Sequence, residues 1–171
     1  MIIKAIIGLG NPGPRFLLTR HNIGFRVIDA LVETTGGNWR KKPEMDYLEV
    51  QINGHPVIVV KPQTFMNLSG KVWPYLQKRG ITVEQLLVVH DELEKPFGSV
   101  TLKQGGSAKG HNGLKSIIAH CGPEFWRVRC GIGRPDDKNQ VPDYVLERFK
   151  ENPEQVDHMI AEAVKLIMNP A

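Results

Sequence analysis

The sequence predicts an α/β fold: a single three-layer domain in which a mixed, mostly parallel, twisted sheet is flanked by helices. Short apolar runs rich in β-branched residues alternate along the chain with apolar patterns of helical period. Asn-Gly joins two of these runs, so at least one strand pair should be an antiparallel hairpin. With 171 residues, 41% hydrophobic and 23% charged, the chain has the composition of one globular domain, expected to cover residues 1–171.

The first part of the chain predicts a strand, a loop and a helix. Residues 2–9 are nearly all apolar, which is typical of a central strand buried on both faces. Residues 10–14 are rich in glycine and proline and can continue neither a strand nor a helix. A helical apolar pattern then runs from Ile23 until the pair Gly36-Gly37 ends it.

A hairpin and a second helix are predicted next. Residues 47–52 and 56–60 have strand patterns, and Asn53-Gly54 between them suits the positive φ angles of a type I′ turn. Ser69 is the expected N-cap of a helix over residues 70–79.

The second half of the chain continues the alternation. Residues 86–89 predict another buried strand, and shorter strand patterns cover residues 99–102 and 127–132. Helices are expected over residues 112–120 and 153–167. In such a fold, binding sites form in the loops beyond the carboxyl ends of the parallel strands.

Composition narrows the functional class. The apolar start at residues 1–7 is too short for a signal sequence and has no basic segment before it. No stretch approaches the roughly 18 apolar residues that a membrane span needs. We therefore expect a cytoplasmic protein with no membrane partner, and the net charge of +4 favours a polyanionic one.

The segment Gly8-Leu9-Gly10-Asn11-Pro12-Gly13 matches the spacing of a dinucleotide-binding fingerprint. Pro12 and Pro14 lack the backbone N–H groups that a pyrophosphate would need, and the helix does not open at the third glycine. We interpret the glycines as a tight turn and expect no cofactor.

His21 and Asp91 are the candidate acid–base pair. His21 lies in the polar cluster Thr19-Arg20-His21-Asn22 near a helix start, where a histidine is often only a cap or a core residue. A helix N-terminus disfavours imidazolium, so His21 should stay neutral near about pH 7 and act as a general base. Asp91, at the end of a strand, would accept the other ring N–H; the alternative for Asp91 is a helix cap or a solvated turn.

Three carboxamides accompany this pair in glycine-rich or methionine-flanked segments: Asn11, Asn67 and Asn112. Each could be a simple turn residue. Together they suit the binding of peptide carbonyls, ribose hydroxyls and a water molecule. Gly-x-Ser-x-Gly is absent, so the expected chemistry is activation of water by His21.

Basic residues gather around the glycine loop at residues 105–110: Lys103 precedes it, Lys109 lies within it, and Arg134 follows later in the chain. Such a cluster is often only a solvated rim, but a glycine loop with lysines is also suited to binding phosphates. The six histidines show no metal-binding spacing, so we expect no metal.

Several motifs together resemble the bacterial peptidyl-tRNA hydrolase family over nearly the whole chain. They are Gly8-Leu9-Gly10-Asn11-Pro12-Gly13, Thr19-Arg20-His21-Asn22-x-Gly24-Phe25, Lys61-Pro62-x-Thr64-Phe65-Met66-Asn67-Leu68-Ser69-Gly70, His90-Asp91-Glu92-Leu93, Gly110-His111-Asn112-Gly113-Leu114-Lys115-Ser116 and Arg129-x-Gly131-Ile132-Gly133-Arg134-Pro135. Their order and spacing are far more specific than any one of them.

The resemblance implies a hydrolase that cuts the ester between a peptide and the 3′ ribose of tRNA, and so recycles tRNA from prematurely released peptidyl-tRNA. It implies His21 as the base and Asp91 as its orienting acid. Substrate would be contacted by Asn11, Phe16, Met66, Asn67, His111 and Asn112, and the tRNA acceptor arm by Lys103, Lys109 and Arg134. It also implies a monomer with no cofactor.

Two positions depart from the family pattern. Phe16 stands where the family commonly has tyrosine, so a hydroxyl contact is lost. Lys109 stands where the glycine loop usually has another glycine, which adds charge along the presumed RNA path.

Two other functions remain open at this point. One is a non-catalytic RNA-binding protein on the same scaffold, like splicing-factor paralogues of the family, although the intact His21, Asp91 and Asn112 argue against it. The other is a peptide hydrolase of similar fold, which would not need basic residues around its cleft.

Overall fold

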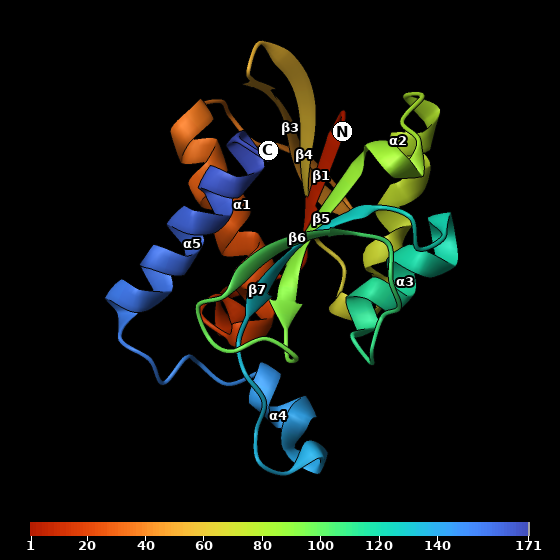
Figure 1. Ribbon diagram of the computed structural model, residues 1–171. Helices are drawn as coiled ribbons and strands as arrows, with labels where there is room; N and C mark the ends of the chain where they lie inside the picture. Colours follow the sequence, from red (N-terminus) through yellow and green to blue (C-terminus); the bar gives the residue numbers. More distant parts are fainter. Residues whose placement is uncertain (171) are drawn as a thin grey trace.

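The computed structural model describes residues 1–170 and shows one twisted sheet between two layers of helices (Figure 1). The strands are β1 (Ala5–Gly8), β2 (Arg40–Lys42), β3 (Met45–Ile52), β4 (His55–Pro62), β5 (Leu86–Glu92), β6 (Val100–Gln104) and β7 (Trp126–Gly131). The α-helices are α1 (Ile23–Thr35), α2 (Trp73–Lys78), α3 (Asn112–Cys121), α4 (Val141–Val145) and α5 (Pro153–Met168). Short 3-10 helices are η1 (Pro14–Phe16), η2 (Arg20–Asn22), η3 (Met66–Val72), η4 (Val83–Gln85) and η5 (Lys138–Gln140).

The sheet has the strand order β2-β3-β4-β1-β5-β7-β6. Its four central strands, β4, β1, β5 and β7, are parallel, whereas β2, β3 and β6 pair antiparallel at the edges. The predicted three-layer α/β fold with a mixed sheet is therefore confirmed. The sheet is parallel only in its centre, because the hairpin and the returning strand β6 add antiparallel pairs on both sides.

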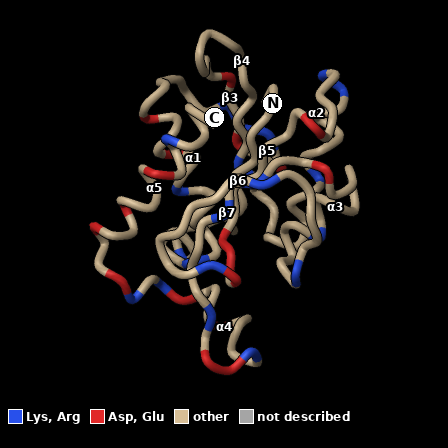
Figure 2. The backbone as a smooth tube through the Cα atoms, viewed as in Figure 1, with Lys and Arg blue, Asp and Glu red and all other residues tan. Residues whose placement is uncertain are grey.

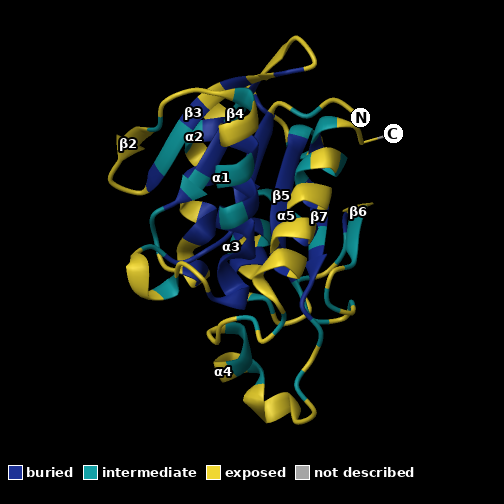
Figure 3. Ribbon diagram, turned by 90° about the vertical axis from the view of Figure 1, so that its left-hand side faces the viewer, coloured by how far each residue is buried: buried dark blue, intermediate teal, exposed yellow. Residues whose placement is uncertain are grey.

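The central strands separate two apolar cores, as strands buried on both faces should. Successive side chains of a strand point to opposite faces. Ile6 of β1 therefore packs with α1 and α5, whereas Ala5 and Ile7 pack with the side that carries η3, α2 and α3. Figure 3 shows these strands buried between helices whose outer faces are exposed.

Individual elements test the sequence interpretation. Asn53 and Gly54 have φ angles of 52° and 79°, which confirms the type I′ hairpin. The Ser69 prediction is wrong: its hydroxyl donates to the Met66 carbonyl at 2.8 Å inside η3, and α2 begins only at Trp73. Within residues 1–170, no helix is both long and apolar enough to cross a membrane.

Gly8 and Gly10 of the first motif and Gly24 of α1 are needed for close packing of α1 against β1 and the residues that follow it. A Cβ added at Gly24 would lie 2.5 Å from the backbone N and O of Leu9 and from the Val89 carbonyl oxygen. A Cβ at Gly8 would lie 2.5 Å from the Gly24 carbonyl oxygen, and one at Gly10 would strike the Phe25 ring. The first two glycines of the fingerprint-like spacing therefore have a packing explanation, and their contacts set how deeply η2 and α1 lie over the sheet. The third, Gly13, has a φ of 101°, which suits the expected turn.

Replacing Gly24 by alanine should lower the free energy of unfolding by about 1–3 kcal/mol, because the new methyl group meets backbone atoms that cannot move away. Denaturant unfolding measures the change. Glu33→Ala, at an exposed position of the same helix, is the matched control and should change stability by no more than about 0.5 kcal/mol. Equal stability of the two variants would contradict the proposed contact.

Candidate active site

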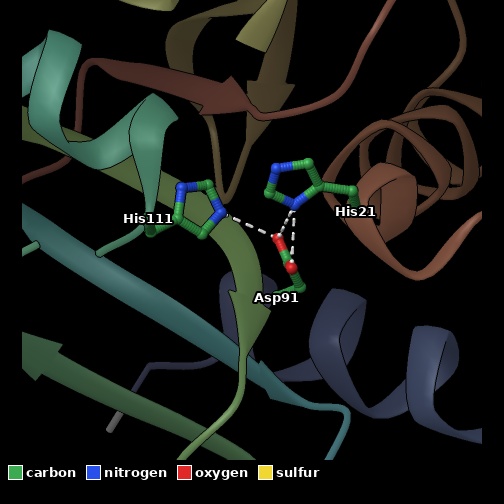
Figure 4. A group of neighbouring side chains, drawn as sticks. All are labelled: His21, Asp91 and His111. Carbon is green, nitrogen blue, oxygen red and sulfur yellow. Dashed lines mark hydrogen bonds and ion pairs between the residues drawn. The ribbon is translucent and has the colours of Figure 1, made fainter. Parts of the chain in front are cut away.

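Three side chains from separate elements meet at the carboxyl end of β5 (Figure 4). His21 comes from η2, Asp91 from β5, and His111 from the loop that leads into α3. His21 Nδ1 lies 3.0 Å from Oδ1 and 2.9 Å from Oδ2 of Asp91, and His111 Nε2 lies 2.8 Å from Oδ1. The Asp91 side chain is only 1% exposed, so a buried carboxylate accepts hydrogen bonds from two imidazoles.

The turn that carries His21 is fixed by the residue before it. Arg20 is 2% exposed, and its guanidinium lies 3.7 Å from the centre of the Tyr144 ring. Its Nη1 donates to the Tyr144 carbonyl at 2.8 Å and contacts Glu147 Oε1 at 3.2 Å. The backbone N–H of Arg20 also donates to the Glu147 carbonyl. These contacts attach η2 to the segment around α4.

The residue after His21 organises the neighbouring loop. Asn22 Oδ1 accepts from the backbone N–H of Asn11 at 2.9 Å, and Asn22 Nδ2 donates to the Asn11 carbonyl at 2.9 Å. Asn11 Oδ1 in turn accepts from the backbone N–H of Met66 at 2.8 Å. The loop after β1, η2 and the start of η3 are thus joined by one buried carboxamide network.

The proton equilibrium of His21 differs from the sequence prediction. Burial by itself lowers the pKa of His21, but the Asp91 carboxylate and its hydrogen bond outweigh burial, so the pKa is raised above 6.5. The Asp91 carboxylate therefore acts in the opposite direction to the helix N-terminus, which was expected to disfavour the imidazolium form.

Asp91 and His90 respond to burial in different ways. Burial favours the neutral acid, yet the two imidazoles hold the pKa of Asp91 well below its usual value. His90 is fully buried, which lowers its pKa to about 3, with the nearby His111 ring adding to the effect. The His90 ring is therefore neutral, and its Nδ1 hydrogen-bonds to the Asp91 backbone carbonyl at 2.8 Å.

The three residues open onto a cleft of about 410 Å³. Asn112 lines this cleft, as do the predicted basic residues Lys103, Lys109 and Arg134. Figure 2 shows basic and acidic residues mixed at this end of the sheet, next to α4. The other charged residues that line the cleft are Glu92, Glu94, Arg127, Arg129 and Lys138. Arg134 is paired with Glu94, so part of its charge is already neutralised.

The remaining predicted residues lie outside that lining. Asn11 is buried and Met66 is 5% exposed, both within the carboxamide network beside η2. Phe16 is half-buried, and its ring meets the edge of Phe65 with centroids 6.4 Å apart. Asn67 is exposed on η3.

The family follows from comparison with known proteins. A family model described as peptidyl-tRNA hydrolase matches residues 5–169. The chain belongs to the peptidyl-tRNA hydrolase family. A peptidyl-tRNA hydrolase from Rubrobacter xylanophilus is 44% identical, with 95% of this chain and 91% of that protein covered. One from Staphylococcus haemolyticus is 47% identical, with 86% and 79% covered.

Solved structures agree with this assignment. The crystal structure of peptidyl-tRNA hydrolase from Acinetobacter baumannii has a TM-score of 0.88 and 37% identity, and covers 97% of this chain and 85% of that one. A purine nucleoside phosphorylase from Toxoplasma gondii has a TM-score of 0.61 at 10% identity, so only its fold is similar. Family membership therefore rests on the closer relatives, since the fold alone does not determine chemistry.

Two structural residues near the cleft had no predicted role. Asn22 belongs to the motif that contains His21, but only the structure reveals its hydrogen bonds to Asn11. Arg127 is 3% exposed and donates to the backbone carbonyls of Gly106 and Ser107, which holds the glycine loop against β7. The sequence signal for this role was that Arg127 and Arg129 alternate with apolar residues in β7. The sequence alone does not show which of the two arginines is buried.

His21, Asp91 and His111 also have the donor types of a metal site, with ligating atoms within 4.8 Å of one another. Each ring nitrogen that faces Asp91 is at hydrogen-bonding distance from it, so a metal would have to replace protons that already join the three groups. The metal-free site stays a prediction, which activity in the presence of a chelator would test.

His90 should make the protein less stable as the pH falls from 6.5 towards 3. The unfolded chain binds a proton to this ring below about 6.5, whereas the folded chain binds it only near a pKa of about 3. Between about pH 7 and 4.5 the wild-type protein should therefore lose about 2–3 kcal/mol of stability through this group, and His90→Leu should lack that loss. Denaturant unfolding at several pH values measures it; parallel curves for the variant and the wild type would contradict it.

Proposed function

We propose that this chain hydrolyses the ester bond between a peptide, or an N-blocked aminoacyl group, and the 3′ ribose of tRNA. The single observation that carries the proposal is the buried His21–Asp91 pair at a cleft with basic residues, in a member of this family. Release of tRNA from prematurely dissociated peptidyl-tRNA would be its role in translation.

His21 supplies the base. Its Nδ1 donates to Asp91, so in the neutral ring Nε2 carries the lone pair. In Figure 4 this nitrogen points away from the carboxylate, and no hydrogen bond within residues 1–170 engages it. Nε2 takes a proton from water while the water oxygen bonds to the ester carbonyl carbon. When the carbon–oxygen bond to the ribose breaks, the imidazolium returns that proton to the 3′ oxygen.

The carboxamides serve as positioning groups in this proposal. Asn11 Oδ1 is already bonded to the Met66 backbone, which leaves its NH₂ group as the end that faces a ligand. Asn67 on η3 and Asn112 at the start of α3 are exposed, as substrate contacts should be. Preorganised donors of this kind stabilise the oxyanion that develops in ester hydrolysis. Phe16 and Met66 would provide apolar contacts beside them.

The basic residues of the cleft would receive the acceptor arm of tRNA. Lys103 and Lys109 are exposed, and both line the cleft. Arg134 would contact phosphate in exchange for Glu94. We also propose that the protein acts as a monomer in the cytoplasm, where peptidyl-tRNA is formed.

His21→Ala should lower kcat by about 10²–10⁴-fold and leave tRNA affinity nearly unchanged, because the ring acts as a base and does not carry the phosphate contacts. Asp91→Asn should cause a smaller loss, because it affects the tautomer and orientation of His21. Release of N-acetyl-aminoacyl groups from tRNA measures both, with unacetylated aminoacyl-tRNA as the control substrate.

Turnover of His21→Ala at the wild-type rate would refute the assignment of the base. If the wild-type protein binds tRNA but hydrolyses nothing, the chain is a non-catalytic RNA-binding relative. Cleavage of peptide esters without RNA, as fast as of the tRNA conjugates, would indicate a peptide hydrolase.

Lys103→Ala should weaken tRNA binding and reduce the slope of log Kd against log salt by about one, as expected when one phosphate contact is lost. Titration of labelled tRNA at several salt concentrations measures the slope. Lys165→Ala, an exposed charge on α5 that does not line the cleft, is the matched control. Equal slopes for both variants would remove Lys103 from the RNA contact.

A further inference from the structure

His111 makes contacts that suggest a different role from substrate binding. We propose that His111 is a positioning residue: a neutral imidazole that caps α3 and gives its one N–H to Asp91, thereby sharing that carboxylate with His21. This inference rests on the proposed function for its effect on catalysis, but it can be tested without any substrate.

The tautomer of His111 follows from its contacts with α3. Its Nδ1 accepts from the backbone N–H groups of Gly113 at 3.1 Å and Leu114 at 3.3 Å, so it is the N-cap of the helix. A nitrogen that accepts hydrogen bonds must hold a lone pair. The single ring proton is therefore on Nε2.

The Nε2–H group then donates to Asp91 Oδ1 at 2.8 Å. The same oxygen lies 3.0 Å from His21 Nδ1, and Oδ2 lies 2.9 Å from it. Because Asp91 is an ionised acceptor, His21 must supply the proton of its own contact. The helix cap thus fixes the tautomer of His111, and the ionised carboxylate that His111 contacts fixes the tautomer of His21.

His111 also limits how strongly Asp91 favours the imidazolium form of His21. A carboxylate that accepts a strong hydrogen bond from a neutral donor has part of its charge stabilised by that donor. With His111 as the donor, Asp91 therefore stabilises the imidazolium form of His21 less than it would alone. A second proton on His111 would have to occupy Nδ1, where it would displace the two N–H groups at the positive end of α3.

Direct binding of substrate is a poor alternative for this side chain. Both nitrogens of His111 are already engaged, and the side chain is only 9% exposed. The ring also packs against its neighbours, with centroids 4.8 Å from His21 and 5.4 Å from His90. A substrate hydrogen bond to His111 would break either the cap or the contact with Asp91.

Other charges that face His21 stay the same in the variants below. They come from β5 and the turn after it, from β6 and the glycine loop, from β7, and from the segment before α4. They are Glu92 and Glu94, Lys103 and Lys109, Arg127 and Arg129, and Arg134 and Lys138. His90, behind His111, is neutral because burial lowers its pKa to about 3.

Two substitutions separate the cap from the contact with Asp91. His111→Ser keeps a good N-cap but removes the donor to Asp91. His111→Gln is a poor cap, but its terminal NH₂ group can take the place of Nε2 and donate to Asp91. The readouts are the ¹⁵N and ¹H NMR titration of the His21 ring without substrate, the pH–rate profile of hydrolysis, and thermal unfolding.

In the wild type, ¹⁵N shifts should show the Nε2–H tautomer for His111 and the Nδ1–H tautomer for His21. His111→Ser should melt near the wild type, but His21 should titrate at a higher pH, so the fraction of maximal kcat at pH 6 falls about three- to tenfold. His111→Gln should melt at a lower temperature and titrate like the wild type.

The proposal is overturned if His111→Ser leaves the His21 titration unchanged, or if His111→Gln moves it as far as His111→Ser does. An Nδ1–H tautomer for wild-type His111 overturns it without any variant. If the titration shifts as expected but the wild-type protein hydrolyses no peptidyl-tRNA, the proposed function fails and the coupling stands. If hydrolysis is intact and the titration does not move, only the coupling fails.

Discussion

The buried negative charge of Asp91 is the constraint on which the site depends. A carboxylate taken out of water costs several kcal/mol unless donors compensate it. Here the donors are two imidazoles from elements far apart in the sequence, so the loop before α3 and the turn η2 must both meet the end of β5. The fold around the cleft can be understood as the arrangement that brings these three groups together.

The sheet provides this arrangement because β5 lies next to β1 in its centre. Their carboxyl ends open on the same side, and close contact at Gly24 lets η2 and α1 approach the end of β5. The second layer brings α3, whose N-terminus needs a cap that His111 supplies. Packing on one face of the sheet places His21, and helix capping on the other face places His111. Both rings therefore contact the same oxygen atom of Asp91, Oδ1.

Much of this could be predicted from the sequence, because the deciding signals are local. The apolar run before His90-Asp91 indicated a buried strand that ends in polar groups, and Asn53-Gly54 fixed the hairpin. The pairing of His21 with Asp91 was also predicted, and the structure confirms their contact. Their catalytic roles remain predictions.

The failures arose where long-range contacts decide. Nothing local shows that Asp91 raises the pKa of His21, that both nitrogens of His111 are occupied, or that Arg20 is buried against Tyr144. Ser69 has the residue type of an N-cap, but the chain continues there as a 3-10 helix. Such features depend on which segments meet in space, and periodicity carries no information about that.

The attachment of Arg20 has a mechanical consequence. Its guanidinium reaches Tyr144 and Glu147, while Val141 and Val145 of the same segment line the cleft. The wall of the cleft and the turn that carries His21 are therefore connected by the Arg20 guanidinium and by the backbone hydrogen bond from Arg20 to Glu147. A ligand that displaces this wall would also displace the backbone next to His21, which couples the fit of the ligand to the alignment of the base.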